Sequence, residues 1–430
     1  MNSKRRIFAG ALALTLVAAA CGDDDSDDSA ADEAESAVSE AEEAAEDAGE
    51  AAEDVASSVE EAAEDVASSV EEAAEDAMDD ESDTTEAMDD GASEEMAEVS
   101  GTLIGAGSSA QAAAMNGWIA GFQELNPDVT IEYDPIGSGG GREQFLAGGS
   151  DFAGSDAALD DEEYQASIET CAGDQGAINL PHYISPIALP YNLPSIEGET
   201  LNLTPEAIAG IFANEITNWN DEAIAESNRD LELPDMTINP VHRSDDSGTT
   251  ENFTDYMSQT APDIWTYGAI EPWDTEGPGR GEGAAQTTGV VQAVAAGEGS
   301  IGYADASQIG DLPAAAVGVA GEFVEYSAEA AGRIVDSSER TGGQSEYDFA
   351  IEVNRNPDSA DTYPIALVSY HIVCLEYDDQ ETVDLVKSFM TYIGSPEGQQ
   401  ASADSAGSAP ISDEVSQEIL VSIDQITVAS

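Results

Sequence analysis

Three short segments place glycine and hydroxylated residues between an expected strand and an expected helix. They are GAGSSA (105–110), GSGGGR (137–142) and RSDDSGTT (243–250). A helix N-terminus offers unpaired N–H groups and about half a positive charge. Glycine lets the backbone approach a ligand closely, and serine or threonine adds O–H donors. One such terminus is commonplace, because Ser and Thr cap many helices. Three of them at one cleft, one with an arginine, predict an anion-binding site.

Other chemistries lack the residues that they need. No lysine follows the glycines as in a P-loop, and GSGGG does not match a dinucleotide-binding fingerprint. An enzyme would use Ser138 or Ser247 as nucleophile and His182, His242 or His371 as base, yet the chain has no G-x-S-x-G motif. Metal-ligand spacings such as H-E-x-x-H or paired cysteines are also absent. We therefore expect no catalysis, no metal and no other cofactor.

Strand and helix patterns alternate around these segments, which is typical of α/β architecture. The sequence predicts strands, some running into turns, within 101–109, 129–136, 151–157, 184–192, 237–245, 299–307 and 362–377. It predicts helices within 110–125, 142–149, 204–219, 249–259 and 380–400, with GSGGG as a turn. Thr204 is the expected N-cap of its helix, with Pro205 at the first helical position.

Several signatures in order make a resemblance specific. They are GAGSS, YDPIGSGGG, DFAGSDA, ITNWND, HRSDDSGTT with NFT and Y following, and GSIGY. Over essentially all of 101–430 the chain resembles the phosphate-binding protein (PstS family) of the Pst-type ABC phosphate importer. The resemblance implies a type II periplasmic-binding-protein fold, with two α/β lobes joined by a two-strand hinge and closing on a dehydrated phosphate. The expected partners are inorganic phosphate and the permease subunits of an ABC transporter, and the protein is expected to be a monomer.

The resemblance also implies a set of ligand contacts. They fall on Ser109, the backbone of Ala110, Ser138, Asp156, Arg243, Ser247, Gly248 and Thr249. The aspartate that holds the family's arginine falls on Asp245. Ser109 stands where a threonine is common, which keeps the hydroxyl, and Ala110 replaces a phenylalanine whose contact is a main-chain N–H. Arg243 is expected to form charge-assisted bonds to phosphate oxygens while Asp245 orients it and largely cancels its charge.

Asp156 is a carboxylate directed at an anion, which makes sense if the ligand carries a proton. Monobasic or dibasic phosphate can donate an O–H to it, whereas fully ionised sulfate cannot, and two facing acceptors would be costly. A receptor for sulfate or another tetrahedral oxyanion is the alternative function, and Asp156 argues against sulfate. Arsenate, a near-isostere of phosphate, stays open.

The two long strand patterns divide the globular part. ISPIALPYN (184–192) and TYPIALVSYHIV (362–373) are the strands long enough to connect two lobes. We expect 101–190 and 366–430 to form lobe I and 191–365 to form lobe II, with crossings near Pro190 and Tyr363. In an exported protein Cys171 and Cys374 are expected to form a disulfide rather than two buried thiols.

The N-terminal hundred residues predict export and anchoring. Basic residues precede an apolar run, as in a signal peptide over 1–20, and AAAC places Cys21 as in a bacterial lipobox. A diacylated Cys21 would anchor the chain stably to the outer side of the cell membrane. Residues 21–100 are an acidic low-complexity tether with 34 Asp and Glu after Cys21 and no Lys or Arg. An 11-residue repeat within it leaves a coiled coil open.

Charge excludes one class of partner. The whole chain carries a formal charge of −79, and residues 101–430 hold 56 Asp and Glu against 8 Arg and Lys, a charge of −48. Such a surface repels nucleic acid and acidic membrane surfaces. It also means that any anion must be bound by local donors rather than by the net field.

Overall fold

The structure is a computed structural model that describes residues 99–342 and 345–430. The expected signal peptide over 1–20, the lipidation site Cys21 and nearly all of the tether over 21–100 lie outside the described residues. Within the described ranges, no helix is both long and apolar enough to cross a membrane.

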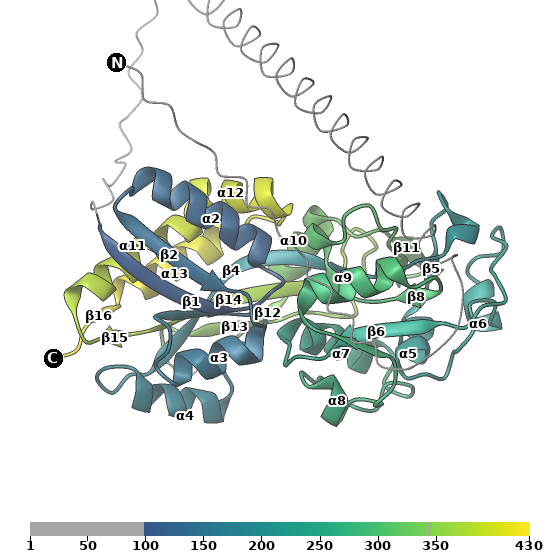
Figure 1. Cartoon of the computed structure of the whole chain (residues 1–430), viewed down its shortest axis with the longest axis horizontal. Helices are drawn as coiled ribbons and strands as arrows, with labels where there is room; N and C mark the ends of the chain where they lie inside the picture. Colours follow the sequence, from purple (N-terminus) through teal and green to yellow (C-terminus); the bar gives the residue numbers. More distant parts are fainter. Residues whose placement is uncertain (1–98, 343–344) are drawn as a thin grey trace, which may run out of the picture. The chain divides into compact units, whose positions relative to one another are not determined.

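The largest sheet has six strands in the order β2-β1-β3-β14-β4-β9. β1 pairs in parallel with β2 and β3, whereas β14 pairs antiparallel with β3 and β4. The strands are β1 (Gly101–Gly107), β2 (Val129–Asp134), β3 (Phe152–Ser155), β4 (Ala177–Ala188), β9 (Ala304–Asp305) and β14 (Ala366–Cys374). Figure 1 shows helices on both faces of this sheet. They are α2 (Ala112–Leu125), α11 (Gln380–Gly394), α12 (Pro396–Ala406) and α13 (Asp413–Asp424) on one face, and α3 (Ser138–Leu146) and α4 (Asp161–Thr170) on the other.

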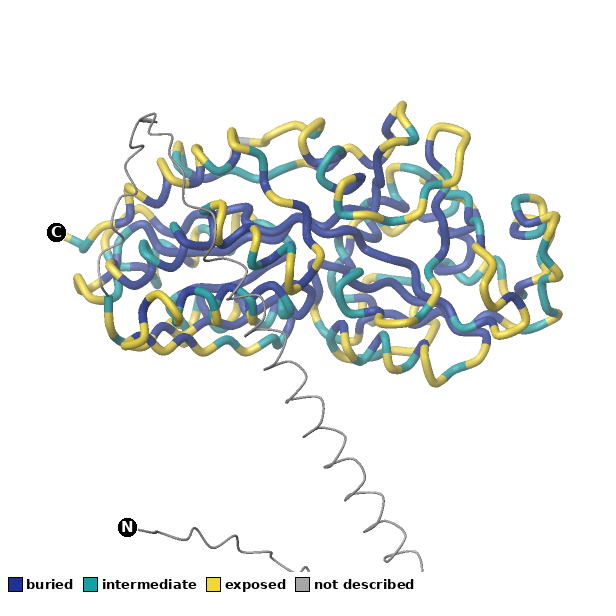
Figure 2. The backbone as a smooth tube through the Cα atoms, turned by 90° about the horizontal axis from the view of Figure 1, so that it is seen from above, coloured by how far each residue is buried: buried dark blue, intermediate teal, exposed yellow. Residues whose placement is uncertain are grey.

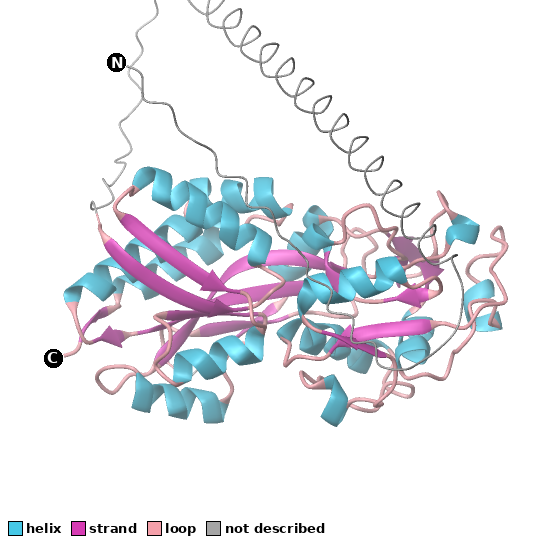
Figure 3. Cartoon of the chain, viewed as in Figure 1, coloured by secondary structure: helices cyan, strands magenta, loops and turns pink. Residues whose placement is uncertain are grey.

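A second group of elements surrounds two three-stranded sheets, β7-β6-β8 and β11-β10-β5. Its strands are β5 (Asn202–Leu203), β6 (Asn239–Arg243), β7 (Glu282–Ala284), β8 (Ser300–Ile301), β10 (Ala316–Val319) and β11 (Glu322–Val324). Its helices are α5 (Pro205–Phe212), α6 (Glu222–Ala225), α7 (Gly248–Thr260), α8 (Trp273–Glu276) and α9 (Gln286–Ala296). Figure 3 shows the alternation of helix and strand in both groups, which confirms the predicted α/β class.

The remaining elements connect these two groups or lie at their edges. They are the short 3-10 helices η1 (Pro194–Ile196) and η2 (Ala306–Gln308), helix α10 (Ala328–Asp336), and strands β12 (Glu339–Gly342), β13 (Phe349–Glu352), β15 (Glu376–Tyr377) and β16 (Thr427–Val428). β12 pairs with β13, and α10 and β13 both pack against β4.

β4 and β14 are buried along their whole lengths and pair antiparallel from Ala177↔Cys374 to Pro186↔Ala366. Figure 2 shows them as continuous buried strands through the middle of the described part. Strands buried on both faces are largely apolar rather than alternating, which fits these sequences apart from buried polar residues such as Asn179, His182 and His371. Their pairing brings Cys374 near Cys171 at the end of α4, and the predicted disulfide between these two residues is present, with Cα atoms 5.5 Å apart.

Several predicted boundaries were wrong. The strand expected over 184–192 is the end of β4, which begins at Ala177 and ends at Ala188, and the helix expected over 204–219 ends at Phe212. GSGGG is not only a turn, because α3 begins at Ser138 and includes three glycines. Its packing explains why: a Cβ on Gly141 would lie 2.3 Å from Cα of Gly107, so only glycine lets α3 approach β1 this closely. The closing helix over 380–400 is broken at Ser395, where Pro396 starts α12, because proline has no N–H to continue α11.

Candidate functional site

The turns at the ends of four strands meet between the two groups of elements. The N–H of Gly137 donates to the carbonyl of Gly107 at 2.8 Å, and the N–H of Ser108 donates to the carbonyl of Gly154 at 2.8 Å. These bonds join the turns that follow β1, β2 and β3. The N–H of Gly139 donates to the carbonyl of Asp246 at 3.2 Å, which joins them to the turn after β6. The N-termini of α3 and α7, two of the three helix termini in the anion-site hypothesis, therefore lie at one place.

Two glycines of GSGGG allow this approach. Gly137 has φ +102°, and a Cβ on it would lie 2.5 Å from Oδ2 of Asp245. A Cβ on Gly139 would lie 2.7 Å from the Cβ of Asp246. Side chains at these positions would therefore push the turn after β6 away from α3.

Asp156 is the residue at which side chains from both groups meet. Its carboxylate is buried and accepts a hydrogen bond from Oγ1 of Thr249 on α7 at 2.8 Å and from Oγ of Ser369 on β14 at 2.8 Å. Its backbone N–H donates to Oγ of Ser138 at 3.1 Å. The structure thus brings Ser138, Asp156 and Thr249 together, and Ser369 is a partner that the sequence did not indicate.

The buried Arg243 and the partly buried Asp245 form an ion pair in the same region. Nε of Arg243 donates to Oδ1 of Asp245 at 2.8 Å, and Nη2 bonds Oδ2 of the same carboxylate. The backbone N–H of Gln286 also donates to Oδ1 of Asp245, at 2.8 Å. Burial acts to raise the pKa of Asp245, but the hydrogen bonds and charge of Arg243 bring it below its ordinary value. Asp245 therefore bonds Arg243 through both carboxylate oxygens and uses only part of the five N–H donors of the guanidinium.

The N-terminus of α7 presents N–H and O–H donors. Ser247 is its N-cap and its Oγ accepts from the N–H of Thr250 at 3.3 Å, which leaves its own hydrogen for donation. Gly248 opens the helix, and a Cβ there would lie 2.9 Å from backbone atoms of Asp156 and Ala157. Thr249 follows, with its hydroxyl directed to Asp156. The positive end of the helix dipole lies at these residues.

Ser109 and Ala110 occupy a separate part of the same region. Oγ of Ser109 lies 3.1 Å from Oγ1 of Thr287 and accepts from the N–H of Thr287 at 3.1 Å. The N–H of Ala110 donates to Oγ of Ser108 at 3.1 Å. Nε2 of Gln308 donates to the carbonyls of both Ser109 and Ala110, at 2.7 and 3.0 Å. Among the described residues, no hydrogen bond joins Ser109 or Ala110 directly to Asp156 or Arg243.

A second buried arginine lies behind Ser138 and Asp156. Arg142, on α3, donates from Nε to Glu163 at 2.7 Å and from Nη1 to Oγ of Ser155 at 2.9 Å. Its Nη1 and Nη2 also bond the two carboxylate oxygens of Glu271, at 3.1 and 2.5 Å. Burial acts to lower the pKa of Arg142, but Glu271 and Glu163 raise it above its ordinary value.

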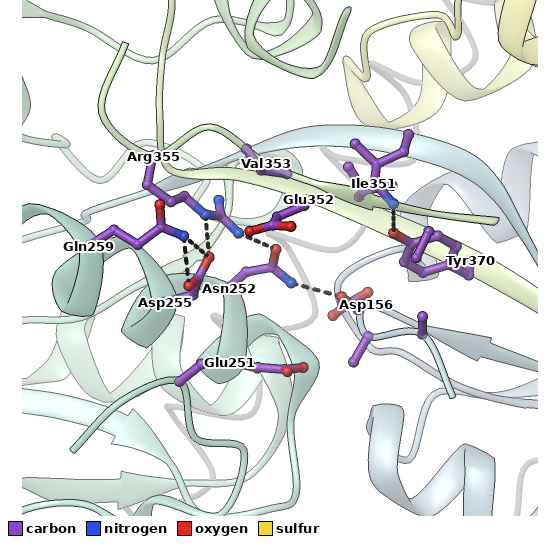
Figure 4. Close-up of a pocket in the computed structure, with 15 residues that line it drawn as sticks. Asp156, Glu251, Asn252, Asp255, Gln259, Ile351, Glu352, Val353, Arg355 and Tyr370 are labelled. Carbon is purple, nitrogen blue, oxygen red and sulfur yellow. Dashed lines mark hydrogen bonds and ion pairs between the residues drawn. The ribbon is translucent and has the colours of Figure 1, made fainter. Parts of the chain in front are cut away.

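A cavity of about 220 Å³ lies beside Asp156, and Figure 4 shows its lining. Arg355 donates to Asp255 at 2.9 Å and to the side-chain oxygen of Asn252 at 2.6 Å, and Asn252 donates to the carbonyl of Asp156 at 2.7 Å. Arg355 also donates to the backbone carbonyls that precede and begin β14. Burial, followed by repulsion from Glu271, raises the pKa of Glu251 in this cavity to about 7.

The histidines that an enzyme would need have other contacts. His182 and His371 face each other in the core with their Nδ1 atoms 3.1 Å apart, and burial lowers the pKa of both. His242 stacks on Trp273. In the described ranges, no group of three or more His, Cys, Asp or Glu side chains is arranged to hold a metal ion.

The fold and the helix termini at its centre are those of a solute-binding protein, and residues 92–397 match the model of the PBP superfamily domain. Phosphate-binding protein PstS 3 of Mycobacterium tuberculosis is 34% identical over 330 residues, which cover 76% of this chain and 86% of that protein. Phosphate-binding protein PstS of Xylella fastidiosa is 32% identical over 292 residues, 66% of this chain and 76% of that protein. The chain therefore belongs to the PstS family of phosphate-binding proteins.

Solved structures agree with this fold. The structure of the high-affinity periplasmic phosphate-binding protein PfluDING bound with phosphate has a TM-score of 0.60 at 20% identity, and the match covers 75% of this chain and 93% of that one. A phosphate-binding protein from Stenotrophomonas maltophilia has a TM-score of 0.57 at 18% identity, with 75% of this chain and 94% of that one covered. The expected two-lobed periplasmic-binding-protein fold is confirmed.

Proposed function

We propose that this protein binds inorganic phosphate between two lobes and delivers it to the permease subunits of an ABC transporter. The observation that carries the proposal is the group formed by Asp156, Thr249, Ser138 and the Arg243–Asp245 pair, which combines anion donors with one buried acceptor. The expected ligand contacts are Ser109, the Ala110 backbone, Ser138, Asp156, Arg243, Ser247, Gly248 and Thr249. The relatives, which are named as phosphate-binding proteins, support phosphate as the ligand.

The structure adds a condition to two of these contacts. The hydroxyl of Thr249 carries one hydrogen, which it donates to Asp156, so its contact with phosphate uses either the backbone N–H or a turned hydroxyl. The Ala110 N–H must likewise share or leave its bond to Ser108. If the Thr249 hydroxyl or the Ala110 N–H turns to phosphate, an internal hydrogen bond is exchanged for a bond to the ligand.

The lobes are proposed as 101–190 with 366–430 and 191–365, joined near Pro190 and Tyr363. The pairing of β4 with β14 and the hydrogen bond from Ile187 N–H to the Ile365 carbonyl support two neighbouring connections at this place. The segment of lobe II that includes α10 and β13 lies against β4 of lobe I. Closure of such lobes on a ligand is a hinge motion that excludes water.

The setting is proposed to be extracytoplasmic, with the chain held at the membrane through a lipid on Cys21. The sequence motif and the family support this, and a monomer is expected. Mass spectrometry of the N-terminal peptide of the mature protein tests it: a diacylated cysteine is expected, and a free thiol at Cys21 would contradict it.

Calorimetric titration of the protein with phosphate, sulfate and arsenate, each alone, tests the ligand. Phosphate is expected to bind much more tightly than sulfate, because phosphate, unlike sulfate, brings a hydrogen for Asp156. Arg243→Met should weaken phosphate binding by at least about tenfold, since bonds to a charged donor are worth about 1.5–3 kcal/mol. Equal binding of sulfate and phosphate would refute the proposal.

A further inference from the structure

Arg142 and Glu271 form an ion pair between residues on opposite sides of the proposed cleft. The guanidinium presents Nη1 and Nη2 end-on to the two oxygens of Glu271, at 3.1 and 2.5 Å. Arg142 lies on α3, in lobe I, and Glu271 lies just before α8, in lobe II. Bidentate arginine–carboxylate pairs are strong and geometrically specific. Because the partners belong to different lobes, the pair requires that the lobes be in contact.

The position of Arg142 is fixed from within its own lobe. It lies one helical turn after Ser138, and its other donors bond Glu163 on α4 and Ser155, which precedes Asp156. The side chains of Arg142 and Glu271 are 7% and 14% exposed, so the pair is screened little by solvent. The guanidinium is occupied by carboxylates and a hydroxyl, which separates its role from that of the phosphate-binding Arg243.

The charge of the chain makes this contact important. By the proposed boundaries, lobe I holds 24 Asp and Glu against 2 Arg and Lys, and lobe II holds 32 against 6, so the lobes carry −22 and −26. Closing them brings like charges together. Asp246 and Glu251 add carboxylates near Glu271, and burial raises the pKa of each. Arg142 is the cation from lobe I whose positive charge offsets the negative charge of these three carboxylates.

We propose that the Arg142–Glu271 pair is a latch that holds the lobes closed and slows the release of phosphate. The proposal rests on the proposed function and goes beyond it, because neither residue is a phosphate ligand. Both are positioning residues: they act on how long phosphate stays, through closure, and not on which anion is recognised. Breaking the pair leaves one buried charge without its partner, which is costly near the site.

The matched test compares Glu271→Gln with Glu163→Gln. Both remove one negative charge from the same arginine, but only Glu271 belongs to the other lobe. Stopped-flow measurements should show phosphate dissociating about tenfold faster from Glu271→Gln, a change of about 1.4 kcal/mol. Less than about a threefold change is expected in Glu163→Gln. The phosphate-to-sulfate affinity ratio should stay at its wild-type value in both variants.

Two further measurements separate the loss of the Arg142–Glu271 pair from other effects of the substitutions. In the full cycle, Arg142→Gln combined with Glu271→Gln should release phosphate no faster than Arg142→Gln alone, because the latch is already broken. Wild-type protein that fails to bind phosphate would refute the proposed function itself. The latch is then tested without ligand, by spin-label distances between the lobes, which should lengthen in Glu271→Gln only. Equal dissociation rates, or equal distances, in Glu271→Gln and Glu163→Gln would overturn the latch.

Discussion

Replacing Asp156 by asparagine tests how phosphate is told from sulfate. In the structure each carboxylate oxygen already accepts one hydrogen bond, from Thr249 or from Ser369, both at 2.8 Å. A carboxylate oxygen can accept two, so each keeps the capacity for one more hydrogen. Phosphate at neutral pH carries an O–H that can fill it, whereas sulfate brings only acceptors. The substitution changes the chemistry of this group at almost unchanged volume.

The magnitude follows from the bonds involved. A hydrogen bond to a charged group contributes about 1.5–3 kcal/mol and a neutral one about 1 kcal/mol, so Asp156→Asn should leave phosphate binding unchanged or weaken it by roughly 1–2 kcal/mol. Sulfate binding should become stronger, because two unprotonated acceptors no longer face each other and the amide can donate. We expect the phosphate-to-sulfate affinity ratio to fall by at least about tenfold, or about 1.4 kcal/mol.

Calorimetry at fixed pH and matched ionic strength measures both affinities. Arg243→Met is the control, because loss of a donor that both anions share should weaken both. The melting temperature of the asparagine variant should stay near that of the wild type, since the amide can still bond the hydroxyls of Thr249 and Ser369. An unchanged affinity ratio would mean that Asp156 is only a turn residue and that selectivity arises elsewhere.

Three other predictions concern charge and stability. Because the pKa of Glu251 is raised to about 7 from 4.5, the folded state binds more protons than the unfolded state between these values, so this group's contribution to stability falls as pH rises through this window. Between pH 5 and pH 8, the free energy of unfolding of Glu251→Gln should therefore rise relative to that of the wild type by up to about 3 kcal/mol, as measured from melting curves. A difference in stability that does not change with pH would contradict the raised pKa. Replacing both Cys171 and Cys374 by serine should lower the free energy of unfolding by up to about 4–5 kcal/mol in chemical denaturation, because their disulfide closes a loop across 203 residues. If the variant were as stable as the wild type, the disulfide would not stabilise the fold. Phosphate association should become faster as salt rises, because salt screens the repulsion between the anion and a globular part of charge −48, and stopped-flow rates that fall with salt would refute this.

The fold was predictable where the signal is local. Thr204 caps α5 through its bond to the N–H of Ala207, and Ser247 caps α7, as Ser and Thr next to a helical pattern indicate. The start of α3 was not predictable in this way, because three glycines have a low helix propensity. Packing of Gly141 on Gly107 decides it, and those two residues are 34 positions apart.

The candidate site was likewise predictable only where its residues stand in local motifs. The segments that hold Ser138 and Ser247 were singled out because they share one pattern, and the family resemblance supplied the individual residues. Ser369, Thr287 and Gln308 were missed, because each lies far along the chain from its partner and stands in no motif. Arg142 had a signal, since it directly follows GSGGG in a chain with few cations, but the partner Glu271 is 129 residues away.

The three arginines that are buried within the described ranges show what kind of anion site an acidic protein can build. Arg243 is bonded by Asp245, Arg142 by Glu163 and Glu271, and Arg355 by Asp255. Each cation is therefore matched by at least one carboxylate, so these pairs add no net positive charge around the cleft. The groups that stay directional are the N–H donors of Arg243 that Asp245 leaves unused, the N–H groups that open α3 and α7, and the acceptor oxygens of Asp156. Selection among anions must then depend on where a ligand carries hydrogens and lone pairs, because the total charge favours none of them.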